Sequence, residues 1–290
     1  MKVCLECGCR SHGEDWKCPK CGYSPEYHCG YLAFVHDLPG AEDNFDIKYF
    51  PKLTEVEDGN FWFESRNRLI IYTLQDYFPN AERFLEIGCG TGFVLSGIKR
   101  EIPDLIVSGS EIYNEALAFA RKRLPDVTLF QMDACRIPFE NEFDVIGAFD
   151  VIEHIEEDEI VLSQIFRALK SEGGTIITVP QHQWLWSVND EIACHKRMYS
   201  RKELVGKMED VGFRIICVTS FISLLFPVMV ASILRWRLFG IKQKDRSGEL
   251  RTPHLINALF KVVCNIERDL VMKGFSFPAG GSLICVGVKE

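Results

Sequence analysis

The chain has 290 residues, of which 47% are hydrophobic and 26% are charged, as in an ordinary globular protein. Its formal net charge of −8 disfavours long-range attraction of nucleic acid. The most apolar stretch, residues 221–234, is shorter than the roughly 18 residues needed to span a membrane. The N-terminus lacks the apolar run of a secretory signal peptide. We therefore expect a cytoplasmic protein with one large domain and a small appendage.

The appendage is a cysteine-rich segment over residues 1–30. Cys4 and Cys7 form one Cys-x2-Cys pair, and Cys18 and Cys21 form a second. Two such pairs bring four thiolates to tetrahedral geometry around zinc. The segment is too short and polar to hold a core without a metal. The sequence therefore predicts a zinc ribbon with these four ligands. Four other side chains remain as alternative ligands: Cys9, His12, His28 and Cys29.

After an expected linker over residues 31–60, the pattern becomes regular. Apolar spacing predicts a helix over residues 61–79 that ends at Pro79. Strands are expected over residues 83–88, 105–111, 127–133, 143–150 and 173–180. Helices are expected over residues 92–102, 114–124 and 158–170, with Gly173 and Gly174 as a helix stop. The alternation predicts an α/β fold with a mostly parallel sheet and helices on both faces.

The segment "LEIGCGTG" places Gly88, Gly90 and Gly92 directly after the first of these strands. In such sheets, ligands bind beyond the carboxyl ends of the strands, at the switch point of the topology. Glu111 ends the second strand, where an acid can accept ribose hydroxyls, and Asp133 ends the third. The pattern predicts a nucleotide-like ligand. A NAD-dependent oxidoreductase is an alternative, although the loop lacks the G-x-G-x-x-G spacing.

"LEIGCGTG", "QMDACRIPF" and "FDVIGAFDVIEHI" resemble the motifs of class I S-adenosylmethionine-dependent methyltransferases. The resemblance covers residues 61–220 and 282–288. It implies a Rossmann-like seven-stranded sheet whose last two strands, over residues 212–220 and 282–290, form an antiparallel pair. A zinc ribbon precedes this domain, and a helical insertion precedes the last strand. The implied cofactor-binding residues are Glu86, Gly88, Cys89, Gly90, Gly92, Glu111, Ile112, Asp133, Ala134 and Asp150.

The resemblance also assigns parts of the cofactor. Glu86 and the glycines would line its methionine part, and Glu111 its ribose. Asp133 and Ala134 would meet the adenine, and Asp150 would face the methyl-transfer centre. Arg66 is expected either to pair with the methionine carboxylate or to lie at the surface.

Methyl transfer is an in-line displacement that is accelerated mainly by orientation, and it needs a base only when the nucleophile must lose a proton. The candidate catalytic residues are Asp150, His154, His182 and His195. Asp150, Glu153 and His154 stand at i, i+3 and i+4, a spacing that resembles the divalent-metal site of quinone O-methyltransferases. Mg²⁺ is therefore a further candidate cofactor. The alternative is that His154 packs at a helix start.

Two segments are expected to meet the acceptor. The loop over residues 181–199 is rich in polar and aromatic side chains, namely His182, Trp184, Trp186, His195, Arg197 and Tyr199. The insertion over residues 221–281 is apolar and contains Arg235, Trp236 and Arg237. Together they predict a roof over a small-molecule or lipid-like acceptor, with peripheral membrane contact. The alternative is that the insertion forms core helices or a dimer interface.

The predicted organisation is a zinc ribbon (1–30), a linker (31–60) and a methyltransferase domain (61–290). The predicted function is methyl transfer from S-adenosylmethionine to a small-molecule or lipid-like acceptor. One alternative is a ribosomal or transfer RNA methyltransferase whose ribbon contacts RNA, although the acidic charge disfavours it. Another is a zinc-containing binding protein without catalysis, although the intact glycine loop disfavours that.

Overall fold

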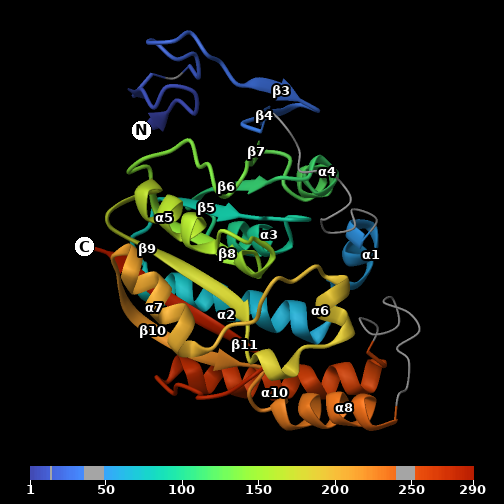
Figure 1. The fold of residues 1–290 in the computed structure, drawn as a ribbon. Coiled ribbons are helices and arrows are strands. Elements are labelled where there is room, and N and C mark those ends of the chain that lie inside the picture. The colour runs from blue at the N-terminus through green and yellow to red at the C-terminus, as the bar shows by residue number, and fades with distance from the viewer. Residues whose placement is uncertain (14, 36–48, 240–251) are drawn as a thin grey trace.

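The computed structural model describes residues 1–13, 15–35, 49–239 and 252–290 (Figure 1). Its centre is a nine-stranded sheet in the order β10-β11-β9-β8-β5-β6-β7-β4-β3. The seven strands expected from the resemblance are β5 (Arg83–Ile87), β6 (Ile106–Glu111), β7 (Thr128–Gln131), β8 (Phe143–Phe149), β9 (Leu169–Pro180), β10 (Phe213–Phe221) and β11 (Ser282–Lys289). The other two, β3 (Glu26–His28) and β4 (Tyr31–Ala33), come from the N-terminal region. A separate pair, β1 (Lys2–Val3) and β2 (Arg10–Ser11), lies within the ribbon.

The sheet is parallel from β9 to β4, while β11 runs antiparallel between β9 and β10. Helices cover both faces. Buried side chains of α2 (Phe61–Tyr77), α3 (Phe93–Glu101) and α4 (Asn114–Arg123) share one core cluster. Those of α5 (Asp158–Ala168) and α7 (Arg201–Val211) share the other. Phe84 joins the first cluster and Leu85 the second, as the two-residue period of a strand requires.

The predicted helix stop at Gly173 and Gly174 is wrong. Helix α5 ends at Ala168, and β9 starts at the next residue and runs through both glycines. A side chain at Gly174 would overlap the ring of Phe78. This glycine therefore permits close packing between β9 and the end of α2.

Parts of the expected ribbon and of the expected linker join the main sheet. Strand β4 pairs in parallel with β7, with Leu32 opposite Phe130, and β3 forms a hairpin with β4. The pairing satisfies main-chain groups on the β7 edge. Helix α1 (Tyr49–Val56) also falls within the expected linker, of which residues 36–48 lie outside the described part. The Trp16 ring lies 4.6 Å from that of Phe34, so the ribbon packs on the main domain.

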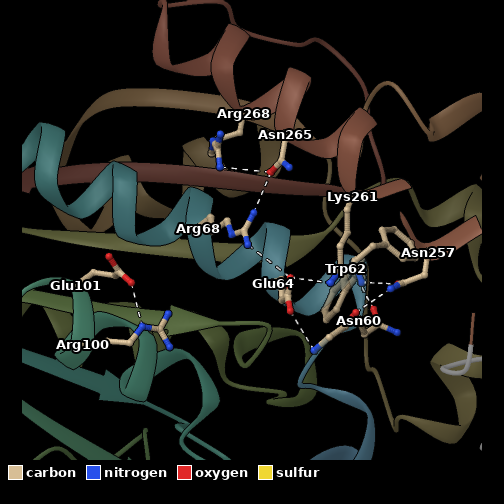
Figure 2. A network of polar contacts seen from close by, with 12 residues as sticks. Asn60, Trp62, Glu64, Arg68, Arg100, Glu101, Asn257, Lys261, Asn265 and Arg268 are labelled. Carbon is tan, nitrogen blue, oxygen red and sulfur yellow. Dashed lines mark hydrogen bonds and ion pairs between the residues drawn. The ribbon is translucent and has the colours of Figure 1, made fainter. Parts of the chain in front are cut away.

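The insertion forms α8 (Phe226–Phe239) and α10 (His254–Met272), at the end of the molecule opposite the ribbon (Figure 1). The Phe260 ring of α10 lies 5.0 Å from the Phe61 ring of α2. A polar network joins the same two helices (Figure 2): Lys261 pairs with Glu64 at 2.9 Å, and Arg68 donates to Asn265 at 3.2 Å. Helix α10 therefore packs against α2 as part of the domain. Among the described helices, none combines the length and hydropathy that a bilayer crossing requires.

Candidate active site

The turn between β5 and α3 contains three glycines with positive φ angles: Gly88 at 66°, Gly90 at 52° and Gly92 at 76°. A Cβ atom at Gly88 would lie 2.5 Å from Val151, and one at Gly92 would lie 3.0 Å from the backbone of Ala120. A Cβ at Gly90 would meet no atom of the described chain within 4 Å. Packing therefore requires the outer glycines, whereas the middle one leaves the backbone accessible.

Glu111 ties this turn to the end of β6. Its carboxylate accepts hydrogen bonds from the backbone N–H groups of Gly90 at 3.0 Å, Ile112 at 2.7 Å and Tyr113 at 3.2 Å. Burial raises the pKa of Glu111, and these three donors oppose that rise. The predicted ribose acceptor and the glycine turn therefore form one unit.

The other predicted cofactor residues surround this unit. Cys89 is buried, its backbone N–H donates to Ser110, and burial raises the thiol pKa well above its usual value. Beyond β7, Asp133 accepts a hydrogen bond from the backbone of Cys135 at 2.8 Å, and Ala134 is buried. The strand ends thus bring the predicted adenosine-binding residues to one rim of the sheet.

A buried charge cluster lies beside the glycine turn. Arg66 of α2 is 9% exposed, stacks 4.4 Å from the Trp62 ring and forms an ion pair with Asp150. Asp150 has a φ of 56° and also accepts a hydrogen bond from Thr178 at 3.1 Å. Glu86 is buried, and burial raises its pKa well above the usual value while Arg66 opposes this. Arg66 is therefore a site residue and not a surface arginine.

Glu57 is a site residue that sequence reasoning missed. It follows α1, it is buried, and its carboxylate accepts a hydrogen bond from Thr91 of the glycine turn at 2.6 Å. Arg123 pairs with the same carboxylate at 2.8 Å. Apolar residues at Phe50, Leu53 and Val56 have helical spacing, which was the available signal for this segment.

A second polar cluster joins the turn after β8 to the loop after β9. The 3₁₀ turn Ile152–His154 contains Glu153 and His154, and His195 lies next to them. One potential ligand atom from each of these three residues lies within 4.8 Å of the other two. The two imidazole rings are 4.7 Å apart. Burial, together with the neighbouring His195, lowers the pKa of His154 to about 4, so this ring is neutral near pH 7. The carboxylate of Asp150 pairs with Arg66, and Asp150 is not a member of this cluster.

The loop after β9 and helix α8 enclose a cavity of about 290 Å³. The loop contains the 3₁₀ turn Gln183–Leu185 and α6 (Val188–Ile192). The cavity is lined by Pro180, Gln181, Leu185, Ser187, Asp190, Met198, Met229, Ser232, Ile233 and Gly281. Arg237 of α8 donates to the carbonyls of Trp184 and Trp186, at 2.7 and 3.0 Å. The His182 ring lies 5.6 Å from Trp184 and 5.4 Å from Phe226. Loop and insertion therefore meet, as predicted.

Two residues of the predicted acceptor loop have other partners. Arg197 pairs with Asp158 at 2.9 Å, and the buried Tyr199 donates to the same carboxylate at 2.6 Å. Lys207 of α7 completes the group at 2.7 Å. These side chains fix the end of the loop to α5, so Arg197 does not line the cavity.

The four ribbon cysteines converge as predicted. The Sγ atoms of Cys4 and Cys21 are 3.6 Å apart, as are those of Cys7 and Cys18, and all four fall within 4.8 Å of one another. A set of four thiols at this spacing fits a tetrahedral zinc ion.

The fold and the site together define a class of protein. A mostly parallel α/β sheet, a glycine turn after the first core strand and acids at the next two strand ends form a Rossmann-like cofactor-binding domain. Residues 84–173 match the model of a family described as a methyltransferase domain. This match, together with similar curated proteins that are S-adenosylmethionine-dependent methyltransferases, supports methyl transfer from S-adenosylmethionine as the activity of the chain.

A Mycolicibacterium smegmatis protein described as a probable S-adenosylmethionine-dependent methyltransferase is 26% identical over 185 residues, which cover 61% of this chain and 68% of that protein. Demethylmenaquinone methyltransferase of Thermotoga maritima is 32% identical over 99 residues, 34% of this chain and 43% of that enzyme. In structure, phosphoethanolamine N-methyltransferase 2 of Haemonchus contortus, solved with S-adenosyl-L-methionine, aligns with a TM-score of 0.56 at 21% identity. That alignment covers 84% of this chain and 57% of that one. The matches thus span only part of these proteins. They support S-adenosylmethionine as the methyl donor and do not specify the acceptor.

Proposed function

We propose that the chain transfers a methyl group from S-adenosylmethionine to a small-molecule or lipid-like acceptor that binds in the cavity between the β9 loop and α8. The cavity is the main observation that supports this proposal. It opens beside Pro180 at the carboxyl end of β9, and β9 neighbours β8, after which Asp150 lies. A volume of about 290 Å³ is at the lower end of small-ligand sites, which suits the reacting end of an acceptor.

The surroundings of the cavity favour an acceptor with an apolar body. Met229 and Ile233 of α8 line it. On the outer side of α10, a stripe of exposed apolar residues follows helical spacing: Leu255, Leu259, Val262 and Ile266. Exposed apolar surface of this kind is typical of contact with lipid or with another protein. The stripe therefore supports a lipid-like acceptor and peripheral membrane contact.

In this proposal, the chain orients the reactants. The glycine turn, Glu86 and Glu111 bind the methyl donor, while Arg66 and Thr178 fix the carboxylate of Asp150 at the transfer centre. Where the acceptor must lose a proton, His182 is the candidate base. Its ring packs beside the cavity loop, and burial lowers its pKa, so it is neutral near pH 7.

We also propose that the four clustered thiols of the ribbon bind structural zinc. All twelve cysteines are free thiols in the structure, and a reducing compartment such as the cytoplasm would keep them so. The hypothesis of Mg²⁺ bound by Asp150, Glu153 and His154 fits less well, because the Asp150 carboxylate is engaged by Arg66.

The proposal predicts that donor and acceptor binding respond to different substitutions. Met229→Trp fills the cavity and should raise the acceptor KM about tenfold or more, since even one methylene in an apolar pocket is worth ~1–3 kcal/mol. Affinity for S-adenosylhomocysteine should not change. Gly90→Val should abolish that affinity, because its side chain enters the accessible side of the turn. Calorimetry with S-adenosylhomocysteine and a labelled-donor screen of acceptor classes measure the two effects.

Val228→Trp is the matched control, because Val228 is 53% exposed on the same helix and does not line the cavity. It should behave as wild type in both assays. Normal turnover by folded Met229→Trp would refute the acceptor site. Normal S-adenosylhomocysteine binding by Gly90→Val would refute the donor site.

A further inference from the structure

The cluster of Glu153, His154 and His195 is built by two segments that the fold fastens together. Glu153 and His154 follow β8, whereas His195 follows α6 in the long loop after β9. The backbone N–H of Lys196 donates to the carbonyl of Glu153 at 2.7 Å, which brings the two segments side by side. A main-chain hydrogen bond therefore holds the two segments of the site together.

Glu153 is in an unusual environment for a carboxyl group. Its side chain is 0% exposed, and neither carboxylate oxygen has a hydrogen-bond partner in the described part of the chain. Burying a carboxyl group without a partner is costly, and native proteins rarely leave one unsatisfied. One ring nitrogen of each imidazole and one Glu153 carboxylate oxygen lie within 4.8 Å of one another. A cation bound by all three would supply the missing partner.

His195 is held in the orientation of a metal ligand. Its Nδ1 atom bonds to Asp190 Oδ1 at 3.0 Å, which leaves Nε2 for a ligand. The other oxygen of Asp190 accepts hydrogen bonds from the Ser187 backbone at 2.8 Å and from the Ser187 hydroxyl at 2.7 Å. A carboxylate behind a histidine in this way fixes the tautomer and the ring position of metal-binding histidines.

We propose that Glu153, His154 and His195 bind one divalent transition-metal ion, such as Zn²⁺, and that Asp190 is a positioning residue for His195. Two imidazoles and one carboxylate suit zinc and neighbouring transition metals, whereas Mg²⁺ prefers oxygen ligands. This set differs from the predicted Mg²⁺ set because His195 replaces Asp150. Three protein ligands leave coordination positions for water or a ligand, unlike the closed four-thiol site.

The position of the site gives the ion a role that rests on the proposed function. Asp190 and Ser187 line the acceptor cavity and Asp190 bonds to His195, so the cluster borders the cavity near the end of β8. An ion there would coordinate an oxygen of the acceptor and lower the pKa of a hydroxyl group, which makes it a better nucleophile. Acceptors with an oxygen nucleophile are therefore favoured over amines.

The test uses the full-length chain and Co²⁺ as the probe, since the ribbon is also expected to bind metal. Thiolate-bound Co²⁺ gives intense charge-transfer absorption that Co²⁺ bound by nitrogen and oxygen lacks, so the two sites are counted separately. Wild type should bind two equivalents. Glu153→Gln and His195→Gln should each lose the equivalent without thiolate absorption and keep the other. Asp190→Asn should weaken that equivalent by about 10–100-fold.

Two controls accompany these variants. Glu191→Gln removes an exposed carboxylate from the same loop, and His254→Gln removes an exposed imidazole from α10. Both should bind two equivalents. Wild-type stoichiometry in folded Glu153→Gln and His195→Gln, or a single equivalent with thiolate absorption in wild type, would overturn the metal site. These readouts do not involve methyl transfer, so such a failure is distinguishable from failure of the proposed function.

Discussion

The two ends of the sheet are completed in different ways. At the β7 edge, β4 and β3 extend the sheet itself, and the segment that carries the four thiols packs through Trp16 against Phe34, Phe130 and Phe139. At the other end, α10 packs against α2 through apolar and polar contacts, while α8 borders the cavity (Figures 1 and 2). The first end is built from main-chain pairing and a predicted metal, and the second from side-chain packing.

The ends also reach different parts of the site. From β3, His28 contacts Gln131 at 3.2 Å and Asn114 at 2.8 Å, and Gln131 donates to the carbonyl of Ile112 at 3.1 Å. Ile112 follows Glu111, the predicted ribose acceptor. The insertion instead contacts the cavity loop. If the proposed function holds, the N-terminal end supports donor binding and the insertion supports acceptor binding.

The largest expected effect comes from removing a ribbon thiol. Cys18→Ser should release the zinc and unfold the ribbon, because structural zinc contributes about 10–16 kcal/mol of apparent binding free energy in small zinc domains. Affinity for S-adenosylhomocysteine should then fall, since Trp16 of this segment packs on Phe34 and Phe130, next to the contacts of His28 with Gln131 and Asn114. Metal analysis, limited proteolysis and calorimetry measure these effects. Cys29→Ser is the control, because Cys29 is an exposed cysteine outside the thiol cluster. Full zinc content in Cys18→Ser would contradict the assignment.

An intermediate effect is expected from the network that fixes the acceptor loop. Tyr199→Phe removes the donor to Asp158 and should cost about 1.5–3 kcal/mol of unfolding free energy near pH 7. Burial raises the pKa of Asp158, but hydrogen bonds from Lys207, Tyr199 and Arg197 outweigh it and hold the pKa below its usual value. The stabilisation is therefore present above about pH 4, the unfolded value, and is lost as the pH falls through the folded pKa.

Denaturant titrations at several pH values check this prediction. The difference between wild type and Tyr199→Phe should shrink in acid. Tyr27→Phe, which alters an exposed tyrosine of the ribbon end, should leave stability unchanged. A penalty for Tyr199→Phe that stays constant down to the lowest pH would mean that the ionised Asp158 does not contribute.

The smallest expected effect tests most directly whether the two ends of the sheet support different ligands. Asn114→Ala removes one contact between the ribbon and α4 and should weaken S-adenosylhomocysteine binding about 2–10-fold, since one hydrogen bond is worth ~0.5–1.5 kcal/mol. Glu64→Gln, at the α2–α10 junction, is the matched change at the other end. Its pair with Lys261 is partly exposed, and ion pairs near the surface contribute ~0.2–1 kcal/mol to stability. Isothermal calorimetry should show no effect of Glu64→Gln on the donor. Equal losses in both variants would remove the distinction between the ends.

The regular part of the fold was predictable because its signals are local. Strand and helix periods placed β5 to β9 close to their observed positions, and the family resemblance did so for β10 and β11. The β4–β7 pairing was not predictable, since β4 has only three residues and its partner lies about a hundred positions away. Gly174 was misread because its close contact with Phe78 is not local in sequence.

The candidate site likewise contains residues that sequence motifs identify and residues that only tertiary packing places. Motifs at strand ends identified Glu111 and Asp150, whose positions follow from the parallel sheet. Glu57 reaches the glycine turn only through the packing of α1 on the domain, so it was missed. Arg197 was grouped with His195 because both lie in one loop, yet the two side chains contact different elements. Loop conformation, which sequence pattern does not specify, decides such cases.

The position of β11 has a consequence for biosynthesis. Strand β11 lies between β9 and β10, although residues 222–281 separate it from β10 in the chain. At ~5–20 residues per second, the ribosome needs about 3–12 s to make that stretch, and during this time β9 has no partner on one side. Its fully buried Ile176, Ile177 and Val179 would then border an open, apolar edge. The nascent chain should therefore depend on chaperone protection until residues 282–289 emerge, and slower translation of the insertion should lower the yield of soluble protein.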